Sequence, residues 1–354
     1  MKQEGSFKGR RNRGRVLKFL AFLLLLALAA AAAFYVILYI PFGPHAETFV
    51  DIAPGTTGVG IGDQLQKSGV IRSRYGFDLL RAWKAGTLKA GEYRFDHPAP
   101  LPEVYARLIK GDVYTVPLTL PEGFNIFDIA QAVQTAGLGS AQDFLTAEQQ
   151  HTELIAAFSP HATSLEGYLF PDTYRFSRHA TPLQMLTAMT RRFRQAAAQL
   201  GLSTDSGSNT SPDIAGLAQT ITLASLVEKE VRQDSERPLV AGVFVNRLAR
   251  GIPLATDPTV IYAALLDNRY RGAIYAADLQ SASAYNTYRH PGLPPGPICN
   301  PGLAALRAAL APAKTDYLYF VSDDQGHTRF SATLSEHAQQ VQQYRQAEHA
   351  AGRR

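Results

Sequence analysis

The stretch "TSLEGYLFPDTYRF", residues 163–176, places the carboxyl group of Glu166 inside an apolar and aromatic segment. Burying a glutamate is unfavourable unless its carboxylate is paired or used. Apolar neighbours disfavour the ionised form and raise the pKa, and an acid that keeps its proton near neutral pH can donate it to a leaving oxygen. Glu166 is therefore a candidate general acid for the cleavage of a glycosidic bond. The competing interpretation is a helix N-cap or a glutamate hydrogen-bonded to backbone.

The chain around this stretch predicts a mixed α+β domain over residues 118–345. From about residue 140 to 200 the pattern is mostly helical, and the Glu166 segment is an irregular interruption. The segment "GLSTDSGSNTSPD", residues 201–213, is typical of a surface loop. Further elements are expected in this order: helices at about 213–231, 234–250, from 257 onward and 301–311, a strand hairpin in "DYLYFVSD" and "HTRFSAT", and a final helix.

Two further acids are candidates for substrate binding. Glu228 lies in "ASLVEKEVRQDSER", where helical spacing favours a solvated face with i,i+4 ion pairs. Because Glu228 follows the apolar run "LASLV", an inward orientation, with Ser225 one turn back, is the alternative. Asp257 lies in "LATDPTVIYA" and is expected to cap a helix that has Pro258 in its first turn.

The segment "SAYNTYRHPGLPPGPICNPG", residues 283–302, is punctuated by proline and glycine and is expected to be a shaped loop. It offers aromatic faces, an amide and hydroxyl groups, which suit the apolar faces and polar rim of a sugar ring. Ordinary turn chemistry explains its prolines and glycines equally well. The candidate substrate-binding side chains are Tyr285, Asn286, Thr287 and Tyr288.

Metal and cofactor chemistry has little support in the sequence. The histidines form no HExxH pattern, and one cysteine, Cys299, excludes an internal disulfide and a cysteine-based zinc site. The chain has neither a GxSxG elbow nor a P-loop. We expect no metal and no cofactor.

The N-terminus is typical of a membrane anchor. Residues 1–18 carry seven basic side chains and one acidic side chain, and residues 19–40 are uncharged, about 33 Å of helix. The basic flank predicts a cytoplasmic N-terminus and a single-pass protein of the plasma membrane, with its bulk in the periplasm or outside the cell. A cleaved signal peptide is the alternative, although its apolar core is usually only about 7–15 residues long. Without the tail the formal charge of +5 becomes −1, so we expect no nucleic-acid binding.

An internal repeat follows the apolar span. The segment "FVDIAPGTTGVGIGDQLQKSGVI", residues 49–71, resembles "VPLTLPEGFNIFDIAQAVQTAGLG", residues 116–139. Each copy predicts a short strand, a turn and an amphipathic helix ended by glycine. We interpret residues 44–117 as a small α+β module similar to a LysM-type glycan-binding unit, with a plain spacer as the alternative. The offset of 68 aligns Gly55 with Gly123, Ile61 with Ile129, Leu65 with Val133, and Gly69 with Gly137.

Several motifs together resemble one known family. The chain carries, in order, "LEGYLFPDTYRF", "ASLVEKEV", "VAGVFVNRL", "LATDPTVIYA", "SAYNTYRHPGLPPGPICNPG" and "AALAPAKTDYLYFVSD". Their order and character resemble the endolytic murein transglycosylase (YceG-like) family over roughly residues 45–340. The resemblance implies a membrane-anchored bacterial enzyme that cuts nascent peptidoglycan strands internally, with its catalytic glutamate at Glu166. It also implies cleft positions for Glu228, Asp257, Asn286 and Tyr288.

A lytic transglycosylase, as the resemblance implies, needs no water nucleophile. The MurNAc 6-hydroxyl of the substrate attacks C1, so that one carboxyl group, here Glu166, first protonates the glycosidic oxygen and then deprotonates the hydroxyl. A second hypothesis is a muramidase that hydrolyses the bond with Glu166 and either Glu228 or Asp257. A third is a non-catalytic peptidoglycan-binding scaffold. Protein partners are expected among penicillin-binding proteins or other elongation or division proteins.

Overall fold

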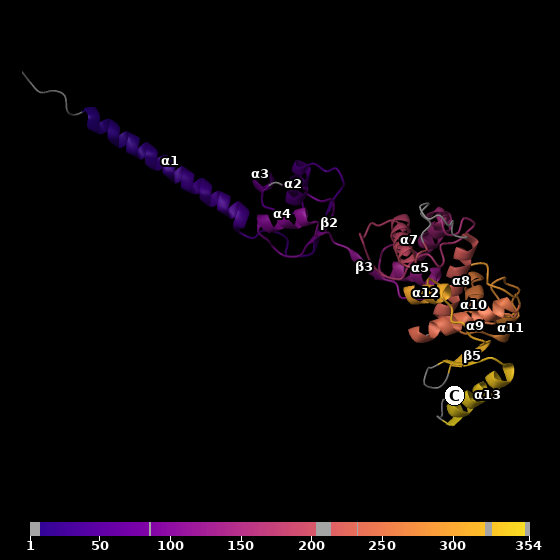
Figure 1. Ribbon diagram of the computed structural model, residues 1–354. Helices are drawn as coiled ribbons and strands as arrows, with labels where there is room; N and C mark the ends of the chain where they lie inside the picture. The colour runs from indigo at the N-terminus through magenta and orange to yellow at the C-terminus, as the bar shows by residue number, and fades with distance from the viewer. Residues whose placement is uncertain (1–7, 85, 203–213, 232, 323–327, 351–354) are drawn as a thin grey trace, which may run out of the picture. The chain divides into compact units, whose positions relative to one another are not determined.

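The computed structural model describes residues 8–350 apart from 85, 203–213, 232 and 323–327. The chain forms two compact units, residues 1–115 and 116–354 (Figure 1). Residues 1–7 of the predicted basic tail and nearly all of the predicted loop at 201–213 lie outside the described residues. Both units combine helices with antiparallel strand pairs, which confirms the predicted α+β class.

The first unit begins with a long apolar helix, α1 (Lys8–Tyr39). Its stretch Arg15–Tyr39, 25 residues, is long and apolar enough to cross a membrane, a test that an N-terminal signal sequence also passes. Residues 15–36 are exposed, whereas Leu38 is 1% exposed and belongs to the core of the module that follows. The C-terminal end of α1 therefore packs on that module.

The rest of the first unit is a βααβα module. Its elements are β1 (Thr48–Ile52), α2 (Gly58–Lys67), α3 (Arg74–Lys84), β2 (Gly91–Phe95) and α4 (Leu101–Lys110). β1 and β2 pair in antiparallel fashion, with Thr48 opposite Phe95. Strands and helices share one core that includes Phe77, Tyr93 and Tyr105. The mixture of strands and helices agrees with the predicted α+β module, whereas likeness to a LysM unit stays a prediction.

The second unit opens with the second copy of the repeat. Its elements are β3 (Val116–Thr119), α5 (Ile126–Thr135), α6 (Ala141–Gln150), the 3₁₀-helix η1 (Thr152–Ile155) and β4 (Thr173–Phe176). The aligned glycines share their backbone conformation: φ is 83° at Gly55 and 79° at Gly123, and 69° at Gly69 and 71° at Gly137. Glycine adopts these left-handed values without steric cost, which explains why both copies have it there.

The Glu166 segment interrupts the helices, as expected, but its last four residues, "TYRF", are a strand rather than irregular. These residues form β4, which pairs in antiparallel fashion with β3, Thr173 opposite Thr119. The two threonine hydroxyls lie 3.0 Å apart across the ladder. The side chains of "TYRF" alternate polar and apolar, which is a short local strand signal, but the pairing partner lies 54 positions earlier in the chain.

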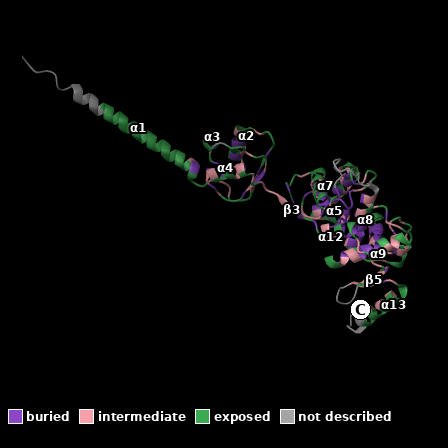
Figure 2. Cartoon of the chain, viewed as in Figure 1, coloured by how far each residue is buried: buried purple, intermediate pink, exposed green. Residues whose placement is uncertain are grey.

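The remaining elements surround a buried central helix, α8 (Ile214–Glu230), whose residues 221–227 are all buried. Figure 2 shows this burial in purple on α8 and on its neighbour α9. The hairpin predicted near the C-terminus is confirmed, and α13 packs on both of its strands. The other elements are α7 (Pro182–Gln199), η2 (Asp234–Glu236), α9 (Arg237–Ala249), α10 (Asp257–Leu266), α11 (Ala276–Leu279), α12 (Leu303–Leu310), β5 (Tyr319–Ser322), β6 (Thr328–Ser331) and α13 (Leu334–Ala350).

Candidate active site

Glu166 lies in a tight turn between η1 and β4. The Tyr168 N–H closes this turn by donating to the carbonyl oxygen of Leu165. At Gly167 φ is +88°, and a Cβ there would lie 2.4 Å from Cγ of Pro297. The "EG" pair therefore has a backbone cause, because only glycine allows this turn to lie against the loop at 283–302.

The carboxyl group of Glu166 is enclosed, and both of its oxygens accept hydrogen bonds. The residue is 3% exposed. Oε2 accepts from the N–H of Ile126, the first residue of α5, at 2.9 Å, and Oε1 accepts from the side-chain amide of Asn300 at 2.8 Å. Burial outweighs these bonds and raises the pKa of Glu166 to about 8. The raised pKa agrees with the expected proton-holding group, and the bond to Ile126 agrees with the competing interpretation.

Asn300 joins the Glu166 turn to the start of α5. Its Oδ1 accepts from the Leu169 N–H at 2.8 Å, and its Nδ2 donates to the Phe124 carbonyl oxygen at 3.0 Å as well as to Glu166. Sequence reasoning missed this residue. The signal was the position of a polar side chain between the apolar "PIC" and the turn "PG" at the end of the 283–302 loop.

A second buried acid, Glu148 on α6, lies near Glu166 and was also missed. Its Oε2 accepts from the Ser164 hydroxyl at 3.0 Å and from the Leu165 N–H at 2.9 Å. Its Oε1 has no hydrogen-bond partner among the described residues. Burial raises the pKa of Glu148, and the nearby Glu148 charge in turn raises the pKa of Glu166.

Glu148 lines a cavity of about 410 Å³ together with Tyr262 and Tyr285. The two tyrosine rings lie 5.1 Å apart, and the Tyr262 hydroxyl is a further hydrogen-bond partner of Glu166. Among the four side chains predicted to bind sugar, Tyr285 is thus the one that comes close to Glu166. Glu166 itself is not among the described residues that line the cavity.

Asn286 and Thr287 are buried and hold the loop rather than face a cavity. Asn286 Nδ2 donates to the carbonyl oxygens of Leu279 at 3.0 Å and Ser281 at 2.8 Å. Thr287 Oγ1 accepts from the Thr256 N–H at 3.1 Å. Both side chains therefore position the tyrosines on either side of them.

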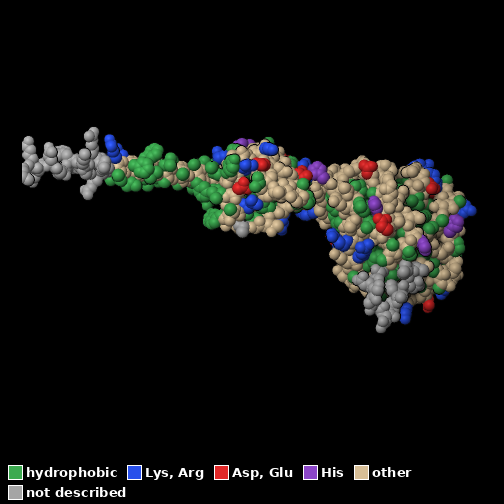
Figure 3. Space-filling model, turned by 90° about the horizontal axis from the view of Figure 1, so that it is seen from above, with side chains coloured by type: hydrophobic (Ala, Val, Ile, Leu, Met, Phe, Trp, Pro, Cys, Tyr) green, Lys and Arg blue, Asp and Glu red, His purple; other side chains and the backbone are tan. Residues whose placement is uncertain are grey.

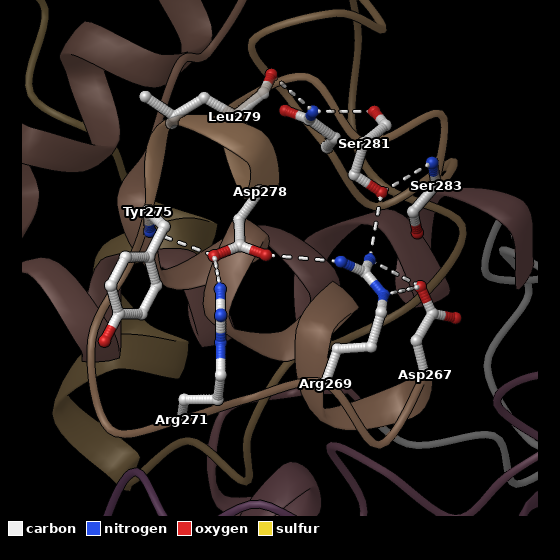
Figure 4. Close-up of polar contacts among 9 residues, drawn as sticks. Asp267, Arg269, Arg271, Tyr275, Asp278, Leu279, Ser281 and Ser283 are labelled. Atoms are coloured by element: carbon white, nitrogen blue, oxygen red, sulfur yellow. Dashed lines mark hydrogen bonds and ion pairs between the residues drawn. The ribbon is translucent and has the colours of Figure 1, made fainter.

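A charged network fixes the chain that leads into this loop (Figure 4). The carboxylate of Asp278 accepts from Arg269 at 3.2 Å and from the Tyr275 N–H at 2.9 Å. Arg269 also donates to Asp267 at 2.7 Å and to the Ser281 hydroxyl at 3.3 Å. Because Ser281 is one of the anchors of Asn286, the network sets where the loop begins.

Glu230, at the end of α8, lines a different cavity, of about 230 Å³. Its carboxyl group accepts a hydrogen bond from the hydroxyl of Thr256. Burial raises the pKa of Glu230, and the charge of Asp257 raises it further. The backbone beside Glu230 is strained at Ala255. Its φ is +49°, in a left-handed region that residues other than glycine rarely occupy.

Asp257 and Tyr288 lie in the same cavity as Glu230. The Tyr288 hydroxyl donates to Oδ1 of Asp257 at 2.7 Å. The prediction that Asp257 caps α10 is wrong: Thr256 occupies the N-cap without a side-chain bond, and Asp257 is in the first turn, where its carboxylate takes the Tyr288 hydroxyl instead of a backbone N–H. Pro258 lies in that turn, as expected.

Glu228 lies in neither cavity. Its side chain is 5% exposed, forms an ion pair with Arg237 at 3.0 Å and accepts from the Gly302 N–H at the start of α12 at 2.9 Å. The solvated face favoured for "VEKE" is therefore wrong for Glu228 and Glu230, and the inward alternative is confirmed for Glu228. Glu230 follows the buried Leu226 and Val227 at helical spacing, and this was the signal that it turns inward.

The comparison of the whole chain with known proteins then decides its family. A sequence model of a protein family, described as the YceG-like family, matches residues 50–343 of the chain. The chain belongs to the YceG-like family. An endolytic murein transglycosylase of Bacillus subtilis (strain 168) is 32% identical over 311 residues, covering 83% of this chain and 84% of that protein.

Two more proteins are similar to this YceG-like chain. An endolytic murein transglycosylase of Streptococcus pneumoniae (strain D39) is 30% identical over 362 residues, which cover 92% of this chain and 64% of that protein, so the chain spans less than two thirds of it. The crystal structure of a yceG-like protein from Listeria monocytogenes has a TM-score of 0.53 at 30% identity and covers 84% of this chain and 99% of that one.

The family motifs of the YceG-like chain gather in two places. The "LEG" and "CNPG" segments meet around Glu166, and the "EKE", "TDP" and "NTY" segments meet around Glu230. Tyr285 belongs to the first place and Tyr288 to the second, with buried residues between them. Among the described residues no cluster of His, Cys, Asp and Glu is able to hold a metal ion.

Proposed function

We propose that this YceG-like protein is an endolytic lytic transglycosylase of peptidoglycan. It cleaves the MurNAc–GlcNAc bond of nascent glycan strands and leaves 1,6-anhydroMurNAc ends. The relatives named endolytic murein transglycosylase support this proposal, because they match 83% and 92% of the chain.

The observation that carries the proposal is the cavity around Glu230. Both Glu166 and Glu230 have raised pKa values, but Glu230 lines a cavity and Glu166 has N–H donors on both oxygens. A general acid must reach the oxygen that it protonates. We therefore assign proton transfer to Glu230, and the role predicted for Glu166 stays a prediction that the same experiment tests.

In the proposed reaction Glu230 gives its proton to the glycosidic oxygen as the C1–O bond breaks. The MurNAc 6-hydroxyl then forms a bond to C1, and its proton passes to the Glu230 carboxylate, which restores the acid. Asp257 is placed to stabilise the positive charge that develops on the sugar ring. The Tyr288 hydroxyl, which is bonded to Asp257, orients that carboxylate.

Two isosteric substitutions test the assignment, Glu230→Gln and Glu166→Gln. We expect Glu230→Gln to lower the rate of anhydro-end formation by about 10²–10⁴-fold, since that is the usual contribution of a general acid–base group. Glu166→Gln is the matched control, because it also replaces a buried, hydrogen-bonded acid. Mass analysis of products from purified glycan strands measures both rates. A large loss for Glu166→Gln with a near-normal rate for Glu230→Gln would assign the reaction to Glu166.

A muramidase that hydrolyses the bond is the second candidate function. The Asp257 carboxylate in the Glu230 cavity favours it, because hydrolases pair their acid with a second carboxylate. The product ends separate the two reactions: hydrolysis leaves a reducing sugar, and the lytic reaction leaves the anhydro sugar. Asp257→Asn should abolish hydrolysis, whereas it should lower a lytic reaction only partly.

We also propose that α1 anchors the protein in the plasma membrane with its N-terminus in the cytoplasm. The 25-residue apolar stretch and the basic flank before it support this topology. Glycan binding by residues 44–117 and contact with penicillin-binding or division proteins remain proposals. Protease treatment of spheroplasts should remove the C-terminal unit and leave an N-terminal epitope intact; loss of the N-terminal epitope would reverse the topology.

A further inference from the structure

Helix α3 carries an apolar stripe that the module core does not use. Tyr75, Leu79 and Trp83 follow one another at a spacing of four, which places them on one face of the helix. They are 71%, 53% and 71% exposed, whereas Phe77 and Leu80 on the opposite face are buried. An exposed stripe with two large aromatic rings indicates contact with something outside the module.

The stripe lies beside the end of the apolar helix. A Cβ on Gly76 would lie 2.5 Å from Cγ2 of Ile37, so α3 packs directly on the last turns of α1. The uncharged residues 19–40 extend about 33 Å as a helix, slightly more than the roughly 30 Å of a bilayer's hydrocarbon core. The level of Ile37 is therefore the outer headgroup region. Figure 3 shows the apolar side chains of α1, with further apolar side chains on the adjoining module.

The residue types around the stripe match a lipid surface. Tryptophan and tyrosine favour the membrane–water interface, and basic side chains are attracted to anionic headgroups. Residues 72–84 contain one acid, Asp78, and four basic side chains, namely Arg72, Arg74, Arg81 and Lys84. Arg74 pairs with Asp63 and Arg81 with Asp78, so the net positive charge comes from Arg72 and Lys84. Aromatic rings together with this charge favour a phospholipid surface over a neutral glycan.

We propose that α3 is an interfacial helix: its stripe of Tyr75, Leu79 and Trp83 rests in the headgroup region of the bilayer that α1 spans. The inference rests on the membrane anchoring proposed above. With two contacts on the bilayer, α1 and α3, the module is held in one orientation and at one height above the membrane.

Trp83 provides its own probe, because it is the one tryptophan of the chain. The full-length protein is reconstituted into vesicles of phosphatidylglycerol and phosphatidylcholine, with or without brominated acyl chains. We expect about a twofold loss of Trp83 emission in the brominated vesicles and protection from acrylamide, because an interfacial ring contacts lipid. The matched control is Trp83→Phe combined with Asp51→Trp, a tryptophan at an exposed position of β1. Its emission should resist bromine and be quenched by acrylamide.

A second variant, Tyr75→Ser with Leu79→Ser, removes the stripe but keeps the probe. It should lower bromine quenching of Trp83 while the protein still floats with the vesicles. If Trp83 in the wild-type chain behaves like the tryptophan at position 51 although the protein floats, the interfacial helix is refuted and the anchor stands. If the protein does not float, the anchor itself fails. An emission change on adding glycan strands, with no bromine quenching, overturns the inference in favour of sugar binding.

Discussion

The two copies of the βααβ repeat differ in the segment between the second helix and the second strand. In the first copy this connection is residues 85–90, and in the second it is residues 151–172. The short connection contains no acid, and the long one carries η1, Glu166 and Gly167. The first copy keeps a core of its own, whereas the second shares its core with α7, α8 and α12. One local fold thus forms a separate module in the first copy and the start of a larger unit in the second, where the longer connection carries Glu166.

The largest expected effect is that of Gly167→Ala in the long connection. A Cβ would clash with Pro297 in a left-handed backbone, so we expect a loss of about 3–5 kcal/mol in unfolding free energy. The matched control is Gly137→Ala, at φ +71° with no atom within 4 Å of the added Cβ. It should lose only the strain, about 1–2 kcal/mol. Denaturant melts in detergent measure both, and equal losses would contradict the packing against Pro297.

The second-largest expected effect is a pH dependence of the unfolding free energy that arises from Glu166, which only the second copy of the repeat contains. The pKa of Glu166 rises to about 8 in the folded protein, above its ordinary value, so the folded state binds the extra proton. Stability conferred by this group is therefore fully present below pH about 4.5 and is lost as pH rises to about 8, at most a few kcal/mol. Glu166→Gln should remove this loss from melts recorded between those pH values. An unchanged slope in the variant would show that Glu166 is ionised in the folded protein.

The smallest effect concerns equivalent pairs on the two strand ladders. Thr119 faces Thr173 in the second copy, and Asp51 faces Glu92 at the same register in the first. Facing acids repel, so Asp51→Thr should stabilise the first unit by a few tenths of a kcal/mol, about 0.2–1. Thr119→Ala should destabilise the second unit by a similar amount. Thermal melts measure both changes. If Asp51→Thr destabilises the protein, the Asp51 carboxylate has a favourable partner and the predicted repulsion is wrong.

The sequence predicted the elements whose signals are local. The helices at 234–250 and 301–311, the two repeat helices and the C-terminal hairpin follow from periodicity, turn glycines and alternation. The burial and raised pKa of Glu166 followed from its apolar neighbours. What failed depended on distant partners: β4 needs β3, and Asp257 takes Tyr288 rather than a backbone N–H.

The candidate site was harder to predict than the fold. Tyr285 and Tyr288 are three positions apart but lie in different cavities, because the buried Asn286 and Thr287 turn the chain between them. Glu230 was overlooked, since charge alternation in "VEKE" resembles a solvated face, and only the buried side chains one turn earlier indicate otherwise. Single-residue chemistry suggested the right types of side chain, but their grouping depends on tertiary contacts.

Asn300 has a consequence for the order in which the chain folds. It satisfies the Glu166 carboxyl group and the Leu169 N–H across 134 and 131 positions of sequence. As the polypeptide emerges from its N-terminus, the first unit completes its core from residues 38–108, but the Glu166 turn waits until the segment ending in "CNPG" has been made. The carboxyl group of Glu166 therefore gains its amide donor late in synthesis. In a chain that ends before residue 300, this carboxyl group lacks the donor.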